Sequence, residues 1–238
     1  TGIKAQKIRD VIFNNLSLKE RSSYNKILLD QDKDKILSSL KNIGYYFATA
    51  DVYVEELGKN LVNVNYEINL GEKARIQKIT FIGDKVYKDR KLRRVILSEE
   101  YKFWKFISGK KFLNEELIEY DSRLLKNFFL NKGFYNVKIN SSFAKLIKNN
   151  EFELIFNIDA GKKINFGSLE LELPNDYANE DFVKLRKLFS NLTGEPYSIN
   201  SLEKILEEID QVALDVQYET VKVDVIEKLN DDKLDLRF

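Results

Sequence analysis

The chain has 238 residues, 43% of them hydrophobic and 12% aromatic, which allows a packed core and argues against a disordered protein. It contains no Cys and no His, which excludes disulfides, thiolate metal sites, and the commonest general base and metal ligand. No apolar run reaches the roughly 18 residues of a membrane-spanning helix, and no charged-then-apolar signal opens the chain, so we expect a soluble piece of a larger protein.

The net charge of +1 is unevenly distributed along the chain. Residues 1–73 carry a net charge of +1, residues 74–163 carry +9, and residues 164–238 carry −9. One explanation is that neighbouring segments attract each other or present ordinary solvated faces. The other is that the basic middle segment faces an anionic partner or a membrane surface.

The first segment predicts two helices followed by a β-hairpin. A helix is expected over Ile3–Phe13, and a second helix is expected to begin at Asp30 or Asp32 and to end at Gly44. A hairpin is expected from Val52 and Val54 followed by Val62–Ile68, where apolar and polar residues alternate as in half-buried strands.

The middle segment opens with a strand over Arg75–Phe81 that stops at the turn signal around Gly83. A short helix should follow, opened by Lys88 or Asp89. Its apolar residues are Leu92, Val95, Ile96 and Leu97.

A longer helix in the middle segment is expected after an aromatic loop. Asn114 is a suitable N-cap, and Lys132 with Gly133 suits a helix C-terminus. Two strands are then expected over Phe134–Ile147 and Phe152–Ile158.

The last segment repeats this order with one departure. A strand is expected over Phe166–Leu173, a helix over Asn179–Asn191, and a second helix opened by a capping box of Asn200 and Glu203. Leu214 stands where a helix-ending glycine is expected, so this helix must end differently. The closing strands are predicted over Tyr218–Ile226 and Leu234–Phe238.

The chain contains an internal repeat of about 90 residues. Val62 and Phe152 begin matching strands, and Gly71 and Gly161 close them. We therefore predict an α+β fold of three tandem βααββ repeats, each a three-stranded mixed sheet with two helices on one face. The boundaries are 1–73 (first strand largely missing), 74–163 (complete) and 164–238 (C-terminally clipped). The third strand of each repeat is expected at the centre of its sheet and the second at an edge.

Three motifs give this pattern a family resemblance. They are Ile79-Thr-Phe-Ile-Gly-Asp84, Lys132-Gly-Phe-Tyr-Asn-Val137 and Phe156-Asn-Ile-Asp-Ala-Gly161. The chain resembles the POTRA domain, the polypeptide-transport-associated repeat, as found in outer-membrane assembly factors of the BamA type. The aromatic insertion at 103–106 is similar to the third such repeat, so the three segments look like the second, third and fourth.

The resemblance implies a periplasmic arm at the outer membrane of a Gram-negative bacterium. Such an arm binds unfolded outer-membrane proteins and accessory lipoproteins, and a membrane β-barrel is expected C-terminal to it. The route open to it is β-augmentation, in which an extended chain pairs with an exposed sheet edge. No cofactor, metal, nucleic acid or catalytic activity is implied.

The predicted partner-binding edge is the second strand of the middle repeat, although Lys138, Lys145 and Lys148 could equally serve to blunt an ordinary edge. It comprises Asn136, Val137, Lys138, Ile139, Asn140, Ser141, Ser142, Phe143, Ala144, Lys145 and Leu146. Weaker candidates are Ala50–Glu55 and Thr220–Val225. The aromatic loop, with Phe103, Trp104 and Phe106, is either a plug under the sheet or a partner contact. The predicted hinges are Gly71, Ala74, Gly161 and Ile164.

Other classes of function fit the sequence less well. The acidic pairs are adjacent in sequence and diverge on a helix, and neither a nucleotide-binding glycine motif nor a catalytic Ser–His or Cys–His pair is present. A KH-like RNA-binding repeat needs a G-x-x-G loop between its two helices. The corresponding residues 108–111 are Ser-Gly-Lys-Lys, with a single glycine. A POTRA arm serving two-partner secretion, organelle import or cell division remains an alternative within the family.

Overall fold

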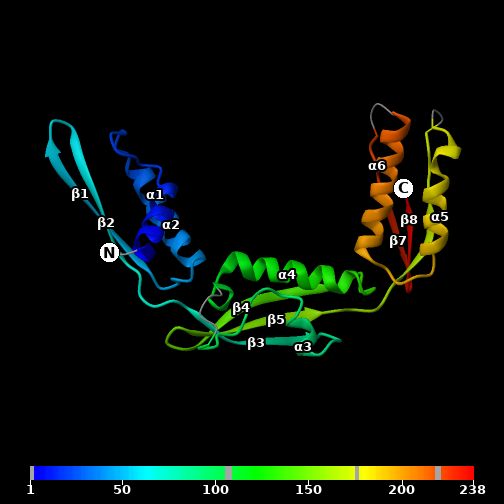
Figure 1. Cartoon of the computed structure of the whole chain (residues 1–238), viewed down its shortest axis with the longest axis horizontal. Helices are drawn as coiled ribbons and strands as arrows, with labels where there is room; N and C mark the ends of the chain where they lie inside the picture. Colours follow the sequence, from blue (N-terminus) through cyan, green and yellow to red (C-terminus); the bar gives the residue numbers. More distant parts are fainter. Residues whose placement is uncertain (1–2, 105–108, 175–176, 218–220) are drawn as a thin grey trace. The chain divides into compact units, whose positions relative to one another are not determined.

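The computed structural model describes residues 3–104, 109–174, 177–217 and 221–238 (Figure 1). The chain divides into two compact units, and each is described by itself. The first unit comprises residues 1–80, 96–121 and 142–156, and the second comprises residues 81–95, 122–141 and 157–238. The division passes through the middle segment.

The first segment forms two helices and a hairpin. The two helices lie side by side next to a two-stranded antiparallel sheet, in which Thr49 pairs with Asn69 (Figure 1). Buried side chains of both helices, including Ile12 and Leu40, meet Ala50 of the sheet in one core. The elements are α1 (Ile3–Asn15), α2 (Lys26–Asn42), β1 (Thr49–Gly58) and β2 (Leu61–Asn69).

The predicted start of α2 is wrong. The helix begins at Lys26, because the side chain of Asn25 accepts hydrogen bonds from the backbone N–H groups of Ile27 and Leu28. Asp30 and Asp32 therefore lie inside the helix, and Asp32 is fully buried.

The middle segment supplies a three-stranded sheet with the order β3-β5-β4. This order confirms that the third strand of the repeat is central and the second lies at an edge. The elements are β3 (Arg75–Asp84), α3 (Asp89–Leu92), the 3-10 helix η1 (Gly109–Lys111), α4 (Glu115–Leu130), β4 (Lys138–Lys148) and β5 (Glu151–Asp159).

The ends of α4 are confirmed. Asn114 Oδ1 accepts from Leu117 N at 2.8 Å, and Gly133 has a φ of 91° just past the helix. Two expectations need correction. α3 ends at Leu92, so Val95, Ile96 and Leu97 follow it. β4 begins only at Lys138, because residues 134–137 form the turn that closes α4, with Phe134 N donating to Phe129 O.

The last segment has a mixed three-stranded sheet with the order β6-β8-β7. β6 pairs with β8 in parallel and β7 pairs with β8 antiparallel. Two helices lie along this sheet, and their side chains share one core with Phe166 and Leu234 (Figure 1). The elements are β6 (Asn165–Glu170), η2 (Asn179–Phe182), α5 (Val183–Leu192), α6 (Ile199–Val216), β7 (Ile226–Asn230) and β8 (Lys233–Arg237).

Both ends of α6 differ from a simple prediction. Ser198, not Asn200, is the N-cap, and its Oγ accepts from Ser201 N at 3.4 Å. Gln217 ends the helix with a φ of 59°, so it takes the left-handed position that glycine fills at 44 and 133. The helix is therefore closed by the same geometry with a different residue.

The predicted edge strand Thr220–Val225 is wrong for the residues that the structure describes. Thr220 lies outside them, and residues 221–225 form no strand. Ile226 pairs with Arg237, the last residue of β8, so in this part of the structure the preceding residues have no ladder partner.

Candidate functional site

The edge strand β4 is the first candidate surface. It lies at the margin of its sheet and is paired with β5 on one side. Most of the predicted edge lies in β4, but Asn136 and Val137 precede the strand, and Val137 is buried. The other weaker candidate, Ala50–Glu55, lies in β1 of the two-stranded sheet.

Apolar and basic side chains are exposed together along β4. Phe143, Leu146 and Ile147 are each about half exposed. Lys138, Asn140 and Lys145 are also exposed, whereas Ile139, Ser142 and Ala144 are partly buried. An extended chain could therefore meet main-chain groups and apolar side chains at one margin.

The aromatic loop is the second candidate surface. Phe103 is 71% exposed and Trp104 is 59% exposed, with their ring centroids 4.6 Å apart in an edge-to-face contact. The expectation of a plug under the sheet is therefore wrong for these two residues, and Phe106 lies outside the described residues. Tyr101, just before this pair, is partly buried: the guanidinium of Arg75 lies 4.7 Å from its ring centroid, and its N–H donates to Ile76 O.

The joint around Ala74 belongs to the first unit and is held by backbone hydrogen bonds. Ala74 N donates to Gly44 O at 2.9 Å, and Ala74 O accepts from Leu113 N at 3.0 Å. Lys73 Nζ donates to Ile43 O at 2.6 Å and lies 4.9 Å and 4.7 Å from the ring centroids of Tyr45 and Phe112. Ala74 is fully buried, so it is fixed to the preceding helix end.

The joint around Ile164 belongs to the second unit and repeats the same backbone contacts. Ile164 N donates to Gly133 O at 2.8 Å, and Ile164 O accepts from Tyr197 N at 2.9 Å. The OH of Tyr135 donates to Glu227, and its ring meets that of Tyr197 edge-on. Ile164, like Ala74, is buried.

The four predicted hinge residues thus occupy two different environments. Gly71 and Gly161 have φ values of 61° and 66°, and a Cβ at Gly71 would meet nothing within 4 Å. Ala74 and Ile164 are buried and hydrogen-bonded. Gly71 and Gly161 thus hold left-handed backbone conformations that glycine adopts without strain, and the hinge role of all four residues stays a prediction.

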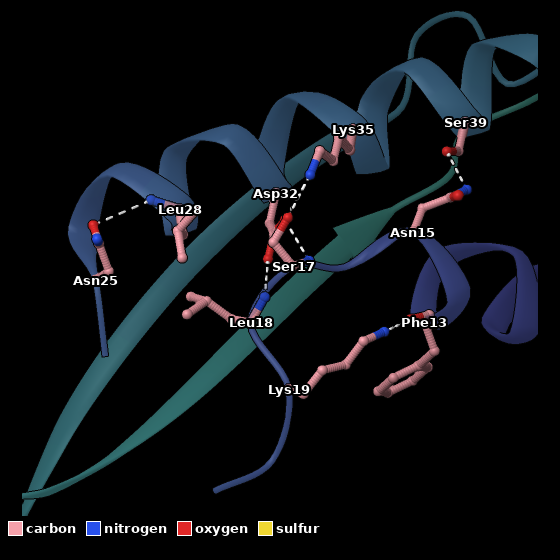
Figure 2. Close-up of polar contacts among 10 residues, drawn as sticks. All are labelled: Phe13, Asn15, Ser17, Leu18, Lys19, Asn25, Leu28, Asp32, Lys35 and Ser39. Atoms are coloured by element: carbon pink, nitrogen blue, oxygen red, sulfur yellow. Dashed lines mark hydrogen bonds and ion pairs between the residues drawn. The ribbon is translucent and has the colours of Figure 1, made fainter. Parts of the chain in front are cut away.

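Sequence reasoning missed a pair of buried carboxylates. Asp32 Oδ1 and Oδ2 accept from Ser17 N and Leu18 N, each at 2.8 Å, and Asp32 Oδ1 lies 3.6 Å from Lys35 Nζ (Figure 2). Burial by itself raises the pKa of Asp32, but the hydrogen bonds from Leu18 and Ser17 and the charge of Lys35 outweigh it and hold the pKa below 3.8.

A matching contact occurs in the middle segment. Asp121 is fully buried and accepts from Leu97 N at 2.6 Å and Ser98 N at 3.1 Å. The sequence indicates these sites by placing an aspartate on the apolar face of a helix. Ile36 lies four residues after Asp32, and Leu125 lies four residues after Asp121, so each pair shares one helix face. Both carboxylates tie the chain before the helix to the helix itself, so they are structural.

The described residues contain neither a side-chain group suited to a metal ion nor a helix suited to spanning a membrane. Among them, no group of three or more His, Cys, Asp or Glu side chains is arranged to hold a metal ion. No helix in this part of the chain is long and apolar enough to cross a membrane.

Comparison with known proteins gives consistent matches. The family model POTRA, described as surface antigen variable number repeat, matches residues 1–71 and 74–161. The outer membrane protein assembly factor BamA of Neisseria meningitidis serogroup B is 26% identical over 66% of this chain and 19% of its own length. BamA of Buchnera aphidicola is 20% identical over 93% of this chain and 36% of its own length.

A solved structure supports the fold. The crystal structure of Haemophilus influenzae BamA POTRA3-5 matches with a TM-score of 0.53 at 16% identity. The match covers 99% of this chain and 90% of the Haemophilus chain. The chain spans about a fifth of the length of the Neisseria BamA and about a third of the length of the Buchnera BamA. Because the family model matches most of its residues, this chain of tandem α+β repeats belongs to the POTRA family.

Proposed function

We propose that the chain is part of the periplasmic arm of an outer-membrane protein assembly factor, with POTRA repeats at 1–73, 74–163 and 164–238. The arm acts as a non-enzymatic scaffold, binding unfolded outer-membrane proteins and accessory lipoproteins by β-augmentation. The family membership and the BamA relatives support the setting. The observation that carries the binding mode is the position of β4 at a sheet edge.

The chemistry of β4 suits clients of many sequences. An edge strand presents main-chain N–H and C=O groups, which bind an extended chain without reading its side chains. The half-exposed Phe143, Leu146 and Ile147 add apolar contact, which an unfolded β-barrel protein can match with its alternating apolar residues. The exposed lysines of β4 keep this margin soluble.

The loop of Phe103 and Trp104 is proposed as a second contact for a folded partner, such as an accessory lipoprotein. A large exposed aromatic pair is the kind of anchor that fills a pocket on a partner surface. Trp104 is the sole tryptophan of the chain, so its fluorescence reports on this loop alone.

Proline substitution at adjacent positions tests the β4 edge. Successive N–H groups of a strand point to opposite sides of it. One of the two variants Ser142→Pro and Phe143→Pro therefore removes an N–H that bonds β5, and the other removes an N–H that points away from β5, toward a partner chain. The variant lacking the outward donor should keep the far-ultraviolet circular dichroism of the parent chain. It should bind a fluorescent unfolded outer-membrane protein up to about tenfold more weakly, as expected for one lost hydrogen bond.

Lys145→Gln is the matched control, because it changes the charge of β4 but keeps its donors. It should bind almost as tightly as the parent chain at physiological salt. Equal client affinity in every folded proline variant would exclude β4 as the contact. Ile139→Pro provides a second position if both central variants lose the fold.

A further inference from the structure

A dense group of cations lies in the turn and single-turn helix that follow β3. Residues 82–95 contain six basic and two acidic side chains, a net charge of +4. Five of the basic side chains are exposed, and we call them the basic cluster: Lys88, Arg90, Lys91, Arg93 and Arg94. One of the two carboxylates, Asp89, already forms an ion pair with Lys85 at 2.5 Å.

The backbone under the basic cluster is fixed by buried side chains of the second unit. Leu92 is fully buried, and the ring of Tyr87 packs edge-on against Phe128 at 5.2 Å. Lys91 Nζ lies 4.2 Å from the ring centroid of Tyr87. The backbone that carries the cations is therefore fixed before any ligand arrives, which lowers the entropy lost on binding.

Two exposed apolar side chains belong to the same stretch of chain as the cations. Val86 is 56% exposed and Ile82 is 42% exposed. Val86 has a φ of 52°, an unfavourable conformation for a β-branched residue, so the fold maintains a strained turn that leaves this side chain in water. Like charges crowded on one turn also repel each other, and an anionic surface would relieve that repulsion.

We propose that residues 82–94 form a membrane-surface contact, in which the basic cluster binds the phosphates of anionic lipid headgroups and Val86 and Ile82 enter the headgroup layer. Several cations and two exposed apolar side chains in one short segment suit a lipid interface, where apolar burial and electrostatic attraction act together. This goes beyond the binding of protein chains at β4 and does not depend on it. A protein partner of acidic composition is the alternative that the experiment must separate.

The first test is flotation of the 238-residue chain with vesicles of phosphatidylcholine alone and of phosphatidylcholine mixed with phosphatidylglycerol. Binding is expected to the mixed vesicles only and should be lost in about 0.5 M salt, where surface charges are screened. The triple variant Lys88→Gln, Arg90→Gln, Arg94→Gln should bind on the order of a hundredfold more weakly, since each cation near an anionic surface contributes about a factor of five to ten.

A matched control separates the basic cluster from net charge. Lys184→Gln, Lys187→Gln, Lys204→Gln removes the same charge from exposed positions on α5 and α6. The control should retain most of the parent affinity. An equal loss in both triple variants, or equal binding to both kinds of vesicle, would overturn the assignment, as would binding of an acidic protein with no vesicle binding.

Val86→Gly provides a second test, because it should change stability and vesicle affinity in opposite directions. Glycine accepts positive φ, so the variant should be at least as stable as the parent in urea denaturation, yet it should bind mixed vesicles severalfold more weakly. A variant that gains stability and keeps full vesicle affinity would show that Val86 does not enter the lipid layer.

Discussion

Two stretches of the chain, 32–74 and 121–164, use the same backbone contacts but surround them with different side chains. Each has a buried aspartate, a helix-ending glycine twelve residues later, and a buried residue whose N–H donates to that glycine. Near Gly44 the supporting contacts are those of Lys73 with the rings of Tyr45 and Phe112. Near Gly133 they are those of Tyr135 with Glu227 and Tyr197. The comparison teaches that the backbone geometry recurs while its side-chain support varies.

The largest expected effect comes from breaking a buried carboxylate contact. Asp32→Ala leaves the N–H groups of Ser17 and Leu18 without their acceptor and should lower the free energy of unfolding by about 2–4 kcal/mol. Urea denaturation measures this loss. Asp34→Ala, at an exposed position of the same helix, should cost less than about 0.5 kcal/mol. Similar losses in both variants would mean that the hydrogen bonds contribute little.

The same contact predicts an acid dependence. The pKa of Asp32 is lowered in the folded state, so its contribution is present above the unfolded value of 3.8 and is lost as the pH falls through the folded value. Stability of the parent chain should therefore decline below about pH 4 more steeply than that of Asp32→Asn.

The two glycines should tolerate alanine to different degrees. Gly44 and Gly133 have φ values of 96° and 91°, which cost an alanine about 1 kcal/mol at either position. A Cβ at Gly44 would lie only 2.9 Å from Phe112 Cβ, whereas the nearest atom at Gly133 is 3.4 Å away. We expect Gly44→Ala to cost about 2–3 kcal/mol and Gly133→Ala about 1 kcal/mol. Equal midpoints in denaturant would contradict this difference.

Tyr135→Phe should have a modest effect at neutral pH, costing about 1 kcal/mol for the hydrogen bond to Glu227. Burial and Glu227 raise the pKa of Tyr135 to about 12, and burial with nearby carboxylates raises that of Tyr197 to about 12. The unfolded chain releases these protons near pH 10, so stability should fall between about pH 10 and 12.

Thermal unfolding followed across that pH range checks the alkaline prediction. Tyr135→Phe should show a shallower decline than the parent chain, because one of the shifted phenols is gone. Tyr66 and Tyr87, whose pKa values are also raised by burial, remain in both chains. Parallel pH profiles would indicate that the Tyr135 proton is not coupled to folding.

Periodicity in the sequence is enough to locate most elements of the fold. Alternation over 62–68 and 152–158 predicted β2 and β5, and the strongly apolar third strand of a repeat was correctly expected at the centre of its sheet. Helix starts were less accurate, because several polar residues near each start can act as caps. Asn25 and Ser198 were overlooked in favour of aspartates and an asparagine farther along the chain.

The candidate surfaces were predicted only in part. β4 was placed correctly at an edge, but its first two predicted residues belong to the turn that closes α4. The exposure of Phe103 and Trp104 could not be decided from sequence, since the same aromatic residues suit a core or a surface. The strained, exposed Val86 had no signal in the sequence, because its φ depends on the turn around it.

The sequence by itself determined the α+β elements, the 90-residue repeat and the uneven charge, because periodicity and composition are local properties of the chain. The tertiary structure alone decided which polar groups meet: Asp32 with the 17–18 backbone, Gly44 with Ala74, and Tyr135 with Glu227. Those pairings join residues 14 to 92 positions apart, and only the folded backbone brings such residues within hydrogen-bonding distance.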